Sequence, residues 1–357
     1  MENLSPCVHI NKKQGEKLRK LLIKLEILDK SKLIKVEGDF IHFAILKKLE
    51  STEKSEILKD FNSAQFTESI FKLKVKSEQS KFLDDLAEYF DQNELKFIPK
   101  SFDIIGKIAI LEIPNEIHSK EKLLAKLLLD RNKSLESVFA KSGKVNGEFR
   151  IRELKFLAGI NNTLTIHKEH GCRYELDIKK VYFSPRLGTE HARIADMTNS
   201  NEIVLDMFAG TGPFSILIAK RKGAKVYSID KNKNAVKFLK KNVILNKVEN
   251  IVVPILGDAK KIILESLESK FDRIIMNLPL ESFNYLPVAC KALKPKGGII
   301  HFYHFQTKSD TYEKIETKLR NEIKKHKRTI SNLKFRRVKS TAPHEWQICV
   351  DIEIEQI

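Results

Sequence analysis

The chain has 357 residues, of which 42% are hydrophobic, and a formal net charge of +18 at pH 7. This length predicts more than one domain, and the hydrophobic content is enough for real cores. The charge predicts attraction to a polyanion such as RNA, DNA or an anionic lipid surface, although a Lys-rich composition alone explains part of it. No run approaches the roughly 20 apolar residues of a membrane helix, and no signal peptide is evident, so we expect a cytoplasmic protein without membrane association.

The cysteines are Cys7, Cys172, Cys290 and Cys349, which stand singly and far apart. Without Cys-x-x-Cys spacing they predict neither a zinc site nor a disulfide framework, and we expect no bound metal. Most should be buried as small apolar side chains. Nothing indicates an obligate protein partner, and we expect a monomer.

The first module is a small mixed domain over residues 1–70. The run "EKLRKLLIKLEIL" (16–28) has leucines at helical spacing, and "DFIHFAIL" (39–46) predicts a strand. The polar stretch 49–69 interrupts this pattern, and we place a boundary near residue 70.

The second module, residues 71–189, is predicted to be a middle RNA-binding domain with a linker hairpin. A strand is expected at 101–113 and a helix at 119–132, where leucines line one face. Alternation of apolar and polar residues over 163–185, around His170 and Gly171, predicts a β-hairpin.

From residue 190 to 357 the pattern becomes strand, turn, helix, repeated. β-rich runs occur at 202–208, 224–230, 250–258, 271–279 and 296–305, with helical patterns between them. This order predicts an α/β, Rossmann-like domain with a doubly wound, mostly parallel sheet. Two strand patterns in 332–357 have no helix between them, so we expect them to close the sheet as an antiparallel pair.

The run "LDMFAGTGPFSI" (205–216) lies at the first strand-to-helix turn, where a nucleotide-like ligand approaches a doubly wound sheet. Gly210 and Gly212 lack the Cβ that would block such an approach. Many dinucleotide fingerprints lack an acid on the strand before the turn, whereas here Asp206 stands four residues before the first glycine. This acid favours S-adenosylmethionine, whose ammonium a carboxylate can hold. Phe208 belongs to the same turn, and we expect it to contribute to the cofactor site.

Two further acids end the following strands. Asp230 suits the ribose hydroxyls, and Asp258 ends the third strand near the expected adenine. Any strand in an α/β protein can end in Asp, but three such acids together with Gly-x-Gly favour a class I S-adenosylmethionine-dependent methyltransferase domain.

The fourth strand ends in Asn277, Leu278 and Pro279. The Asn amide can pair with the edge of a planar base, and Pro stiffens the loop. The same tripeptide is also an ordinary turn, so the motif alone leaves both interpretations open.

At this point the sequence resembles the archaeal and eukaryotic tRNA guanosine-37 N1-methyltransferases, most closely the three-domain archaeal form. The resemblance rests on "GEFRIRELKFLAG", "VYFSPRLGTEHARI", "DMFAGTGPFSI", "IMNLP" and "VKSTAPHEW", among other runs, whereas residues 50–100 resemble nothing we can place. It implies an N-terminal domain that checks the outer corner of tRNA, a middle domain and a catalytic domain.

The resemblance also implies roles for individual residues. Glu190 corresponds to the general base and Arg150 to the arginine that faces the target guanine. Asn277 and Pro279 correspond to the base-holding loop, and the family's cofactor acids to Asp206 and Asp230. In a further motif, Tyr182 and Pro185 shape the base pocket.

The chemistry explains these residue types. Guanine N1 carries a proton that must leave before attack on the sulfonium methyl, and Glu190 can accept it. Negative charge then shifts to O6, where the Arg150 guanidinium can stabilise it.

Without the resemblance, Glu190 could be a solvated acid at a helix start, and Arg150 could form a surface ion pair. Guanine 37 is stacked, so the enzyme must also extrude it.

Three alternatives remain open. One is a wyosine-pathway enzyme that transfers an aminocarboxypropyl group from the same cofactor, and another methylates C7 of a wyosine intermediate. The third is an RNA-binding protein with a degenerate methyltransferase fold. Asn277 and Glu190 argue against the first, and the intact acids and glycines of the turn argue against the third.

Overall fold

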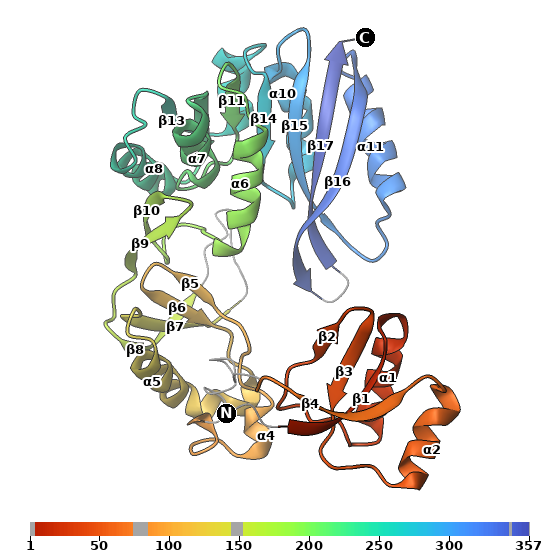
Figure 1. Cartoon of the computed structure of the whole chain (residues 1–357). Helices are drawn as coiled ribbons and strands as arrows, with labels where there is room; N and C mark the ends of the chain where they lie inside the picture. The colour runs from red at the N-terminus through yellow and green to blue at the C-terminus, as the bar shows by residue number, and fades with distance from the viewer. Residues whose placement is uncertain (1–3, 74–84, 144–152, 343–344, 357) are drawn as a thin grey trace. The chain divides into compact units, whose positions relative to one another are not determined.

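The computed structural model describes residues 4–73, 85–143, 153–342 and 345–356 (Figure 1). The chain divides into two compact units, residues 1–95 and 96–357. Among the described residues, no helix is long and apolar enough to cross a membrane. All four cysteines are free and buried, as expected.

The first unit contains an antiparallel sheet in the order β2-β3-β1-β4. Its strands are β1 (Leu4–Asn11), β2 (Lys35–Glu37), β3 (Phe40–Ala44) and β4 (Gln65–Ile70), and its helices are α1 (Lys12–Lys24), α2 (Ser51–Asp60) and α4 (Gln92–Leu95). The predicted helix and strand are confirmed as α1 and β3. Alternation along β1 places Val8 and Ile10 in the core with Leu18 of α1, and places Cys7 and His9 on the opposite face.

The polar stretch 49–69, expected to interrupt regular structure, forms α2 and β4. Glu53 caps α2 by accepting from the Glu50 N–H at 2.9 Å, and Ile57 is buried in the core. A capping box and one well-placed apolar side chain therefore suffice for this helix, despite its polar composition.

The second unit begins with a sheet in the order β5-β6-β7-β8, together with a helical stretch. Its elements are β5 (Asp103–Ile105), β6 (Ile108–Leu111), η1 (Asn115–Lys120), α5 (Glu121–Arg131), β7 (Ser137–Lys141) and β8 (Leu154–Gly159). The single strand expected at 101–113 is wrong, because Gly106, at φ +57°, reverses the chain and makes β5 and β6 an antiparallel pair.

The predicted hairpin is confirmed as β9 (Leu164–Glu169) and β10 (Cys172–Asp177). Its turn residues, His170 and Gly171, both have positive φ. The hairpin lies against α8 (Lys233–Leu245) of the following sheet domain. There the Asn242 side chain bonds both backbone groups of Glu175, and the Asn246 side chain does the same for Arg173.

The largest sheet has seven strands in the order β13-β12-β11-β14-β15-β17-β16. The first five are parallel, and β17 pairs antiparallel with both of its neighbours, which confirms the predicted fold class and its antiparallel closure. The strands are β11 (Ile203–Asp206), β12 (Lys225–Asp230), β13 (Val252–Leu256), β14 (Arg273–Met276), β15 (Gly298–Gln306), β16 (Arg328–Ala342) and β17 (Glu345–Gln356).

Helices cover both faces of this sheet (Figure 1). One buried cluster includes apolar side chains of α6, α7 and α8, and another includes those of α9, α10 and α11. The elements are η2 (Pro185–Leu187), α6 (Gly188–Met197), α7 (Pro213–Lys222), α9 (Ala259–Ile262), η3 (Ile263–Leu267), α10 (Ser282–Ala292) and α11 (Tyr312–Lys324). The carboxyl ends of β11, β12 and β14 thereby meet at one edge, where ligands of such sheets bind.

Candidate active site

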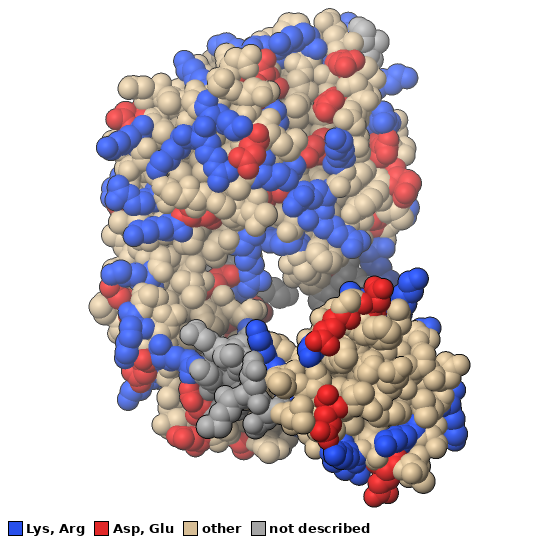
Figure 2. All heavy atoms as spheres, in the orientation of Figure 1, with Lys and Arg blue, Asp and Glu red and all other residues tan. Residues whose placement is uncertain are grey.

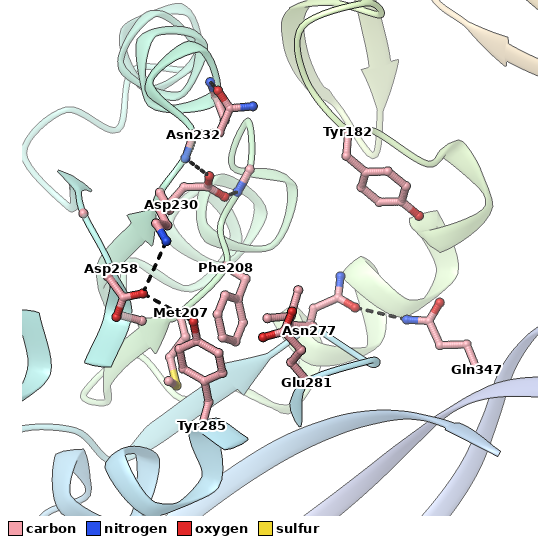
Figure 3. A pocket seen from close by; sticks show the side chains of 16 residues that line it. Tyr182, Met207, Phe208, Asp230, Asn232, Asp258, Asn277, Glu281, Tyr285 and Gln347 are labelled. Atoms are coloured by element: carbon pink, nitrogen blue, oxygen red, sulfur yellow. Dashed lines mark hydrogen bonds and ion pairs between the residues drawn. The ribbon is translucent and has the colours of Figure 1, made fainter. Parts of the chain in front are cut away.

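A cavity opens at this edge of the sheet (Figure 3). It holds about 990 Å³ of space between atoms, including its open mouth, which is enough for a nucleoside-sized ligand. The lining residues are Tyr182, Met207, Phe208, Gly210, Asp230, Lys231, Asn232, Ala235, Gly257, Asp258, Ala259, Asn277, Leu278, Glu281, Tyr285 and Gln347.

The two glycines of the first turn have different roles. Gly210 lines the cavity at φ +55°, and a Cβ there would have only the Tyr182 carbonyl oxygen nearby, at 3.9 Å. Gly212, at φ +94°, begins α7, and a Cβ there would lie 2.4 Å from Leu239 Cδ1. Gly210 thus leaves space on the ligand side of the turn, whereas Gly212 permits close packing of α7 on α8.

Asp230 is the carboxylate that holds this turn. Its Oδ2 accepts from the Gly210 N–H at 2.7 Å, and its Oδ1 accepts from the Asn232 N–H at 2.8 Å. Burial raises the pKa of Asp230, and these two hydrogen bonds oppose that rise. Its oxygens lie at the cavity wall, where each has a lone pair left for a ligand hydroxyl (Figure 3).

Asp206 lies outside the set of residues that line the cavity. It is 0% exposed, and its Oδ2 accepts from the Ser215 hydroxyl at 2.7 Å. The Ser228 hydroxyl donates in turn to Ser215 at 2.8 Å. Burial, with a smaller contribution from the charge of Asp230, raises the pKa of Asp206 to about 7. In this structure Asp206 supports the turn, and its contact with a cofactor ammonium stays a prediction.

The wall beyond Asp230 combines a carboxylate with aromatic rings. Asp258 caps α9 by accepting from the Lys260 N–H at 2.8 Å, and it accepts from the Tyr285 hydroxyl at 3.4 Å. The ring of Phe208 meets that of Tyr285 edge to face, with centroids 4.9 Å apart. A flat heterocycle with an amino group fits such a wall, because the rings offer apolar surface and the carboxylate accepts a proton donor.

The opposite side of the cavity carries the predicted base loop. Asn277 follows β14 and accepts from the Gln347 amide through Oδ1 at 3.0 Å, and Tyr182 lies across from it (Figure 3). Lys339 of β16 donates to the Tyr182 hydroxyl at 3.4 Å. Pro279 and Pro185 lie beside this region, one in the loop after β14 and one at the start of η2, and neither lines the cavity.

Glu190 is buried on α6, with 3% of its surface exposed, so it is no solvated helix-start acid. Its Oε1 accepts from the Tyr303 hydroxyl at 2.8 Å and from Arg193 at 2.7 Å, and its Oε2 accepts from Arg193 Nε at 2.9 Å. Arg336 of β16 approaches Oε2 at 3.6 Å. Glu190 is outside the set of cavity-lining residues, and Arg150 lies outside the described residues.

A chain of buried and partly buried polar side chains continues from Glu190. Arg193 also donates to Asp351 at 2.6 Å, and Asp351 pairs with His301 Nδ1 at 2.6 Å. Hydrogen bonds from His301 and Arg193 hold the pKa of Asp351 below its usual range, although burial alone would raise it. This network fixes the orientation of the Glu190 carboxylate from behind.

Several lining residues escaped the sequence analysis, namely Asn232, Glu281, Tyr285 and Gln347. Asn232 had a local signal, because it follows a strand-end acid and caps α8. Gln347 had no local signal, because β17 places it next to Asn277, which lies 70 positions earlier in the chain.

Three related family models match most of the chain. The TRM5/TYW2 methyltransferase domain matches residues 165–331, the TYW2 N-terminal domain matches 83–163, and the tRNA methyltransferase 5 N-terminal domain matches 7–53. The tRNA (guanine(37)-N(1))-methyltransferase Trm5b of Pyrococcus abyssi is 39% identical over 348 residues, 98% of each chain. The chain belongs to the Trm5 family of tRNA methyltransferases.

Other relatives differ in how much of the chain they cover. Trm5b of Methanocaldococcus jannaschii is 37% identical over 98% of this chain and 99% of its own. The tRNA 4-demethylwyosine(37)-methyltransferase Taw21 of Saccharolobus solfataricus is 38% identical over 71% of this chain and 94% of its own. Of these relatives, the two Trm5b proteins match the chain over nearly its full length, whereas Taw21 matches only part of it.

Solved structures of the Trm5 family share the fold. P. abyssi Trm5b has a TM-score of 0.70, 37% identity and coverage of 98% of this chain and 99% of its own. A complex of aTrm5 with tRNALeu has a TM-score of 0.65, 36% identity and coverage of 97% and 99%. M. jannaschii TYW2 in complex with AdoMet has a TM-score of 0.56, 29% identity and coverage of 72% and 100%.

Proposed function

We propose that this protein transfers a methyl group from S-adenosylmethionine to N1 of guanosine 37 in tRNA. The observation that carries the proposal is the full-length likeness to Trm5b proteins of that named activity, combined with a cavity at the glycine turn that has a carboxylate at each of two strand ends. The positive net charge and the many Lys and Arg side chains on the visible face of the unit 96–357 (Figure 2) suit a polyanionic substrate.

The described residues fit S-adenosylmethionine. Gly210 leaves the cavity side of its turn open where a Cβ would intrude, Asp230 offers lone pairs suited to a ribose, and Asp258 lies beside the Phe208 and Tyr285 rings that suit an adenine. Asp206 lies beneath the turn, where its bond with Ser215 holds the start of α7 in place. When bound, the cofactor supplies a methyl group already activated on a sulfonium.

On the substrate side we assign Asn277, held by Gln347, to the edge of the target base. Tyr182 forms the facing wall, while Pro279 and Pro185 stiffen the loops around it. These positions are close to β16, whose Lys339 contacts Tyr182. The base would enter between the loop after β14 and the segment that precedes α6.

Glu190 is proposed to accept the N1 proton, and Arg150 to stabilise the charge on O6. The network of Tyr303, Arg193 and Asp351 supports this role, because it presents Glu190 in one orientation. To accept the proton, Glu190 Oε2 must become accessible to the base. Arg336 Nε now lies 3.6 Å from this oxygen, so Arg336 would have to move away. The phosphates of bound tRNA are natural partners for such an arginine.

The division of labour along the chain is part of the proposal. Residues 1–70 would recognise the body of tRNA, residues 71–189 would bind RNA and carry the linker hairpin, and residues 190–357 would bind the cofactor and perform catalysis. The protein would act in the cytoplasm as a monomer, with no obligate protein partner.

The wyosine-pathway activities are the alternatives within the same fold. They are disfavoured because the relative named for 4-demethylwyosine methylation covers 71% of this chain, whereas the Trm5b relatives cover 98%.

The deciding experiment is methyl transfer from labelled S-adenosylmethionine to unmodified tRNA transcripts with G37 or A37, with the product nucleoside identified by mass. N1-methylguanosine from the G37 transcript alone, lost in Glu190→Ala, is the expected result. If the protein binds the cofactor, leaves G37 unmodified and modifies 4-demethylwyosine tRNA, the wyosine alternative replaces this proposal.

A further inference from the structure

The outer face of the first sheet carries a cluster of metal-ligand side chains that the proposed function does not use. Cys7 and His9 lie two residues apart on β1, and His42 of β3 pairs directly with His9 in the register of the sheet. One ligand atom from each of the three can be chosen so that all lie within 4.8 Å of one another. Side chains i and i+2 of one strand, together with the cross-strand partner, share one face.

Both imidazoles have an oxygen neighbour at Nε2, which makes Nδ1 the acceptor nitrogen of each ring. His9 Nδ1 lies 3.4 Å from the Thr67 hydroxyl, which also contacts Cys7 Sγ at 3.2 Å and would have to turn away when a metal binds. His9 Nε2 bonds the Gln65 side-chain oxygen at 3.0 Å, and His42 Nε2 lies 3.5 Å from the Glu37 carboxylate. An oxygen acceptor at Nε2 places the proton there, so Nδ1 of each ring carries a lone pair. A metal-binding His is commonly oriented in this way, by a carboxylate or carbonyl oxygen at its other nitrogen.

The His42 Nδ1 atom is buried and has no hydrogen-bond partner among the described residues. The whole residue is only 9% exposed. A buried acceptor without a donor costs about 1–3 kcal/mol relative to a satisfied one. A cation at this point would use the lone pair, and the neutral imidazole is the form that binds a metal.

We propose that Cys7 Sγ, His9 Nδ1 and His42 Nδ1 bind a Zn²⁺ ion, with a water molecule as the fourth ligand. One thiolate and two imidazoles form a common zinc donor set, with bonds of about 2.3 Å to sulfur and about 2.0 Å to nitrogen. Ligand atoms of such a tetrahedron lie about 3.5 Å apart, so the three side chains close by up to about an ångström on binding. The His9 and His42 rings, which now stack with an interplanar angle of 26°, must also turn so that both Nδ1 lone pairs point at the ion. The Cys7 thiol releases one proton per ion as it binds the metal as a thiolate.

A second cluster meets the same distance criterion and provides a contrast. His301, Cys349 and Asp351 also lie within 4.8 Å of one another, but both ring nitrogens of His301 are engaged, one with Asp351 and one with Arg273. Arg193 donates to Asp351 and Arg273 contacts His301 Nε2, so a guanidinium group contacts each member of this His–Asp pair. Those positive charges repel a cation, and we assign no ion there.

The zinc site would connect the two central strands of the first unit, β1 and β3 (Figure 1). No Cys-x-x-Cys spacing marks it, because two ligands come from one strand and the third comes from a strand more than 30 residues later. This assignment revises the expectation of no metal drawn from cysteine spacing. It is independent of the methyl-transfer reaction, since none of its residues lines the catalytic cavity.

The test uses the full-length protein, stripped with a chelator and titrated with Zn²⁺. We expect one zinc per chain by elemental analysis, and binding at least tenfold weaker in both Cys7→Ser and His42→Asn. Cys290→Ser, which alters a buried cysteine with no ligand cluster, and Cys349→Ser, which alters the second cluster, should bind zinc as the wild type does. Absence of zinc binding, or binding lost in Cys349→Ser and kept in Cys7→Ser, would overturn the assignment.

Wild-type protein supplies a second readout, in case a variant fails to fold. Cys7 and Cys172 are both buried, so both should be alkylated slowly in the absence of zinc. Zinc should slow the alkylation of Cys7 further, measured peptide by peptide, and should leave that of Cys172 unchanged. Co²⁺ in place of Zn²⁺ should give a thiolate-to-metal absorption band. Equal labelling of Cys7 with and without zinc, and no such band, would contradict the proposal.

Discussion

Tyr303 donates its hydroxyl to Glu190 Oε1 at 2.8 Å, and both side chains are buried. The bond joins β15 to α6, elements more than 100 residues apart in the chain. It holds the proposed general base from the side away from solvent.

Replacing Tyr303 by Phe should therefore slow methyl transfer without weakening cofactor binding. Loss of one hydrogen bond to a carboxylate corresponds to about a tenfold decrease in single-turnover rate. The dissociation constant for S-adenosylmethionine should stay unchanged, because Tyr303 lies outside the cavity-lining set. Tyr174→Phe is the matched control, since Tyr174 is equally buried and donates to the Pro213 carbonyl. An unchanged rate in Tyr303→Phe would remove Tyr303 from this positioning role.

Asp230→Asn should weaken S-adenosylmethionine binding at least tenfold. An amide can accept from only one of the two N–H groups that Asp230 now binds, and it offers fewer lone pairs to the ribose. Calorimetric titration measures the effect, and tRNA affinity should be retained. Asp272→Asn serves as the control because Asp272 lies at the amino end of β14, the opposite edge of the sheet from the cavity, where it pairs with Lys294. Equal cofactor affinities in the two variants would contradict the assignment of Asp230.

Substitution of the two glycines should separate binding from stability. Gly210→Ala places a methyl group on the ligand side of the turn, so it should abolish cofactor binding and destabilise the fold by only about 1 kcal/mol. Gly212→Ala drives a methyl group into Leu239, at 2.4 Å, and should lower the melting temperature much further. Thermal unfolding with and without S-adenosylmethionine checks both. The reverse order of melting temperatures would show that the packing argument is wrong.

Asp206 makes the fold sensitive to pH in an unusual direction. Its pKa rises from 3.8 to about 7 on folding, so between these values the folded state holds a proton that the unfolded chain releases. The stabilising contribution is complete below about pH 4 and is lost as the pH rises through about 7.

Asp206→Asn, which mimics the protonated form, should therefore stabilise the apo protein at pH 8. The expected gain is on the order of 1–3 kcal/mol, and it should vanish toward pH 4. Chemical denaturation at several pH values measures it, with the exposed Asp196→Asn as the control. A gain independent of pH would show that desolvation of the carboxylate is not its cause.

The sequence predicted the catalytic domain well because its signals are local. Strand-end acids, the glycine turn and the helical pattern between the strands each lie within a few residues, and β11, β12 and α8 follow from them directly. The hairpin turn at His170 was equally local.

Other features depended on contacts distant in the sequence. Glu190 is held by Tyr303 directly and by Asp351 through Arg193, and no local pattern links Tyr303 or Asp351 to it. The position of Asp206 beneath the turn could not be distinguished from one in the cavity wall, because both satisfy the same strand-end pattern. The turn at Gly106 was missed because it lies within an apolar run whose pattern is that of a single strand.

The two asparagines of α8 affect more than the position of the hairpin. Asn242 and Asn246, one turn apart, satisfy both backbone groups of alternate residues in β10, as a neighbouring strand would. A helix thus covers a sheet edge that would otherwise be free to pair with another chain. Because the amides bind backbone atoms, the side chains of Arg173 and Glu175 can change over evolution without undocking the hairpin. Neither asparagine can be replaced by Asp, which has no N–H to donate.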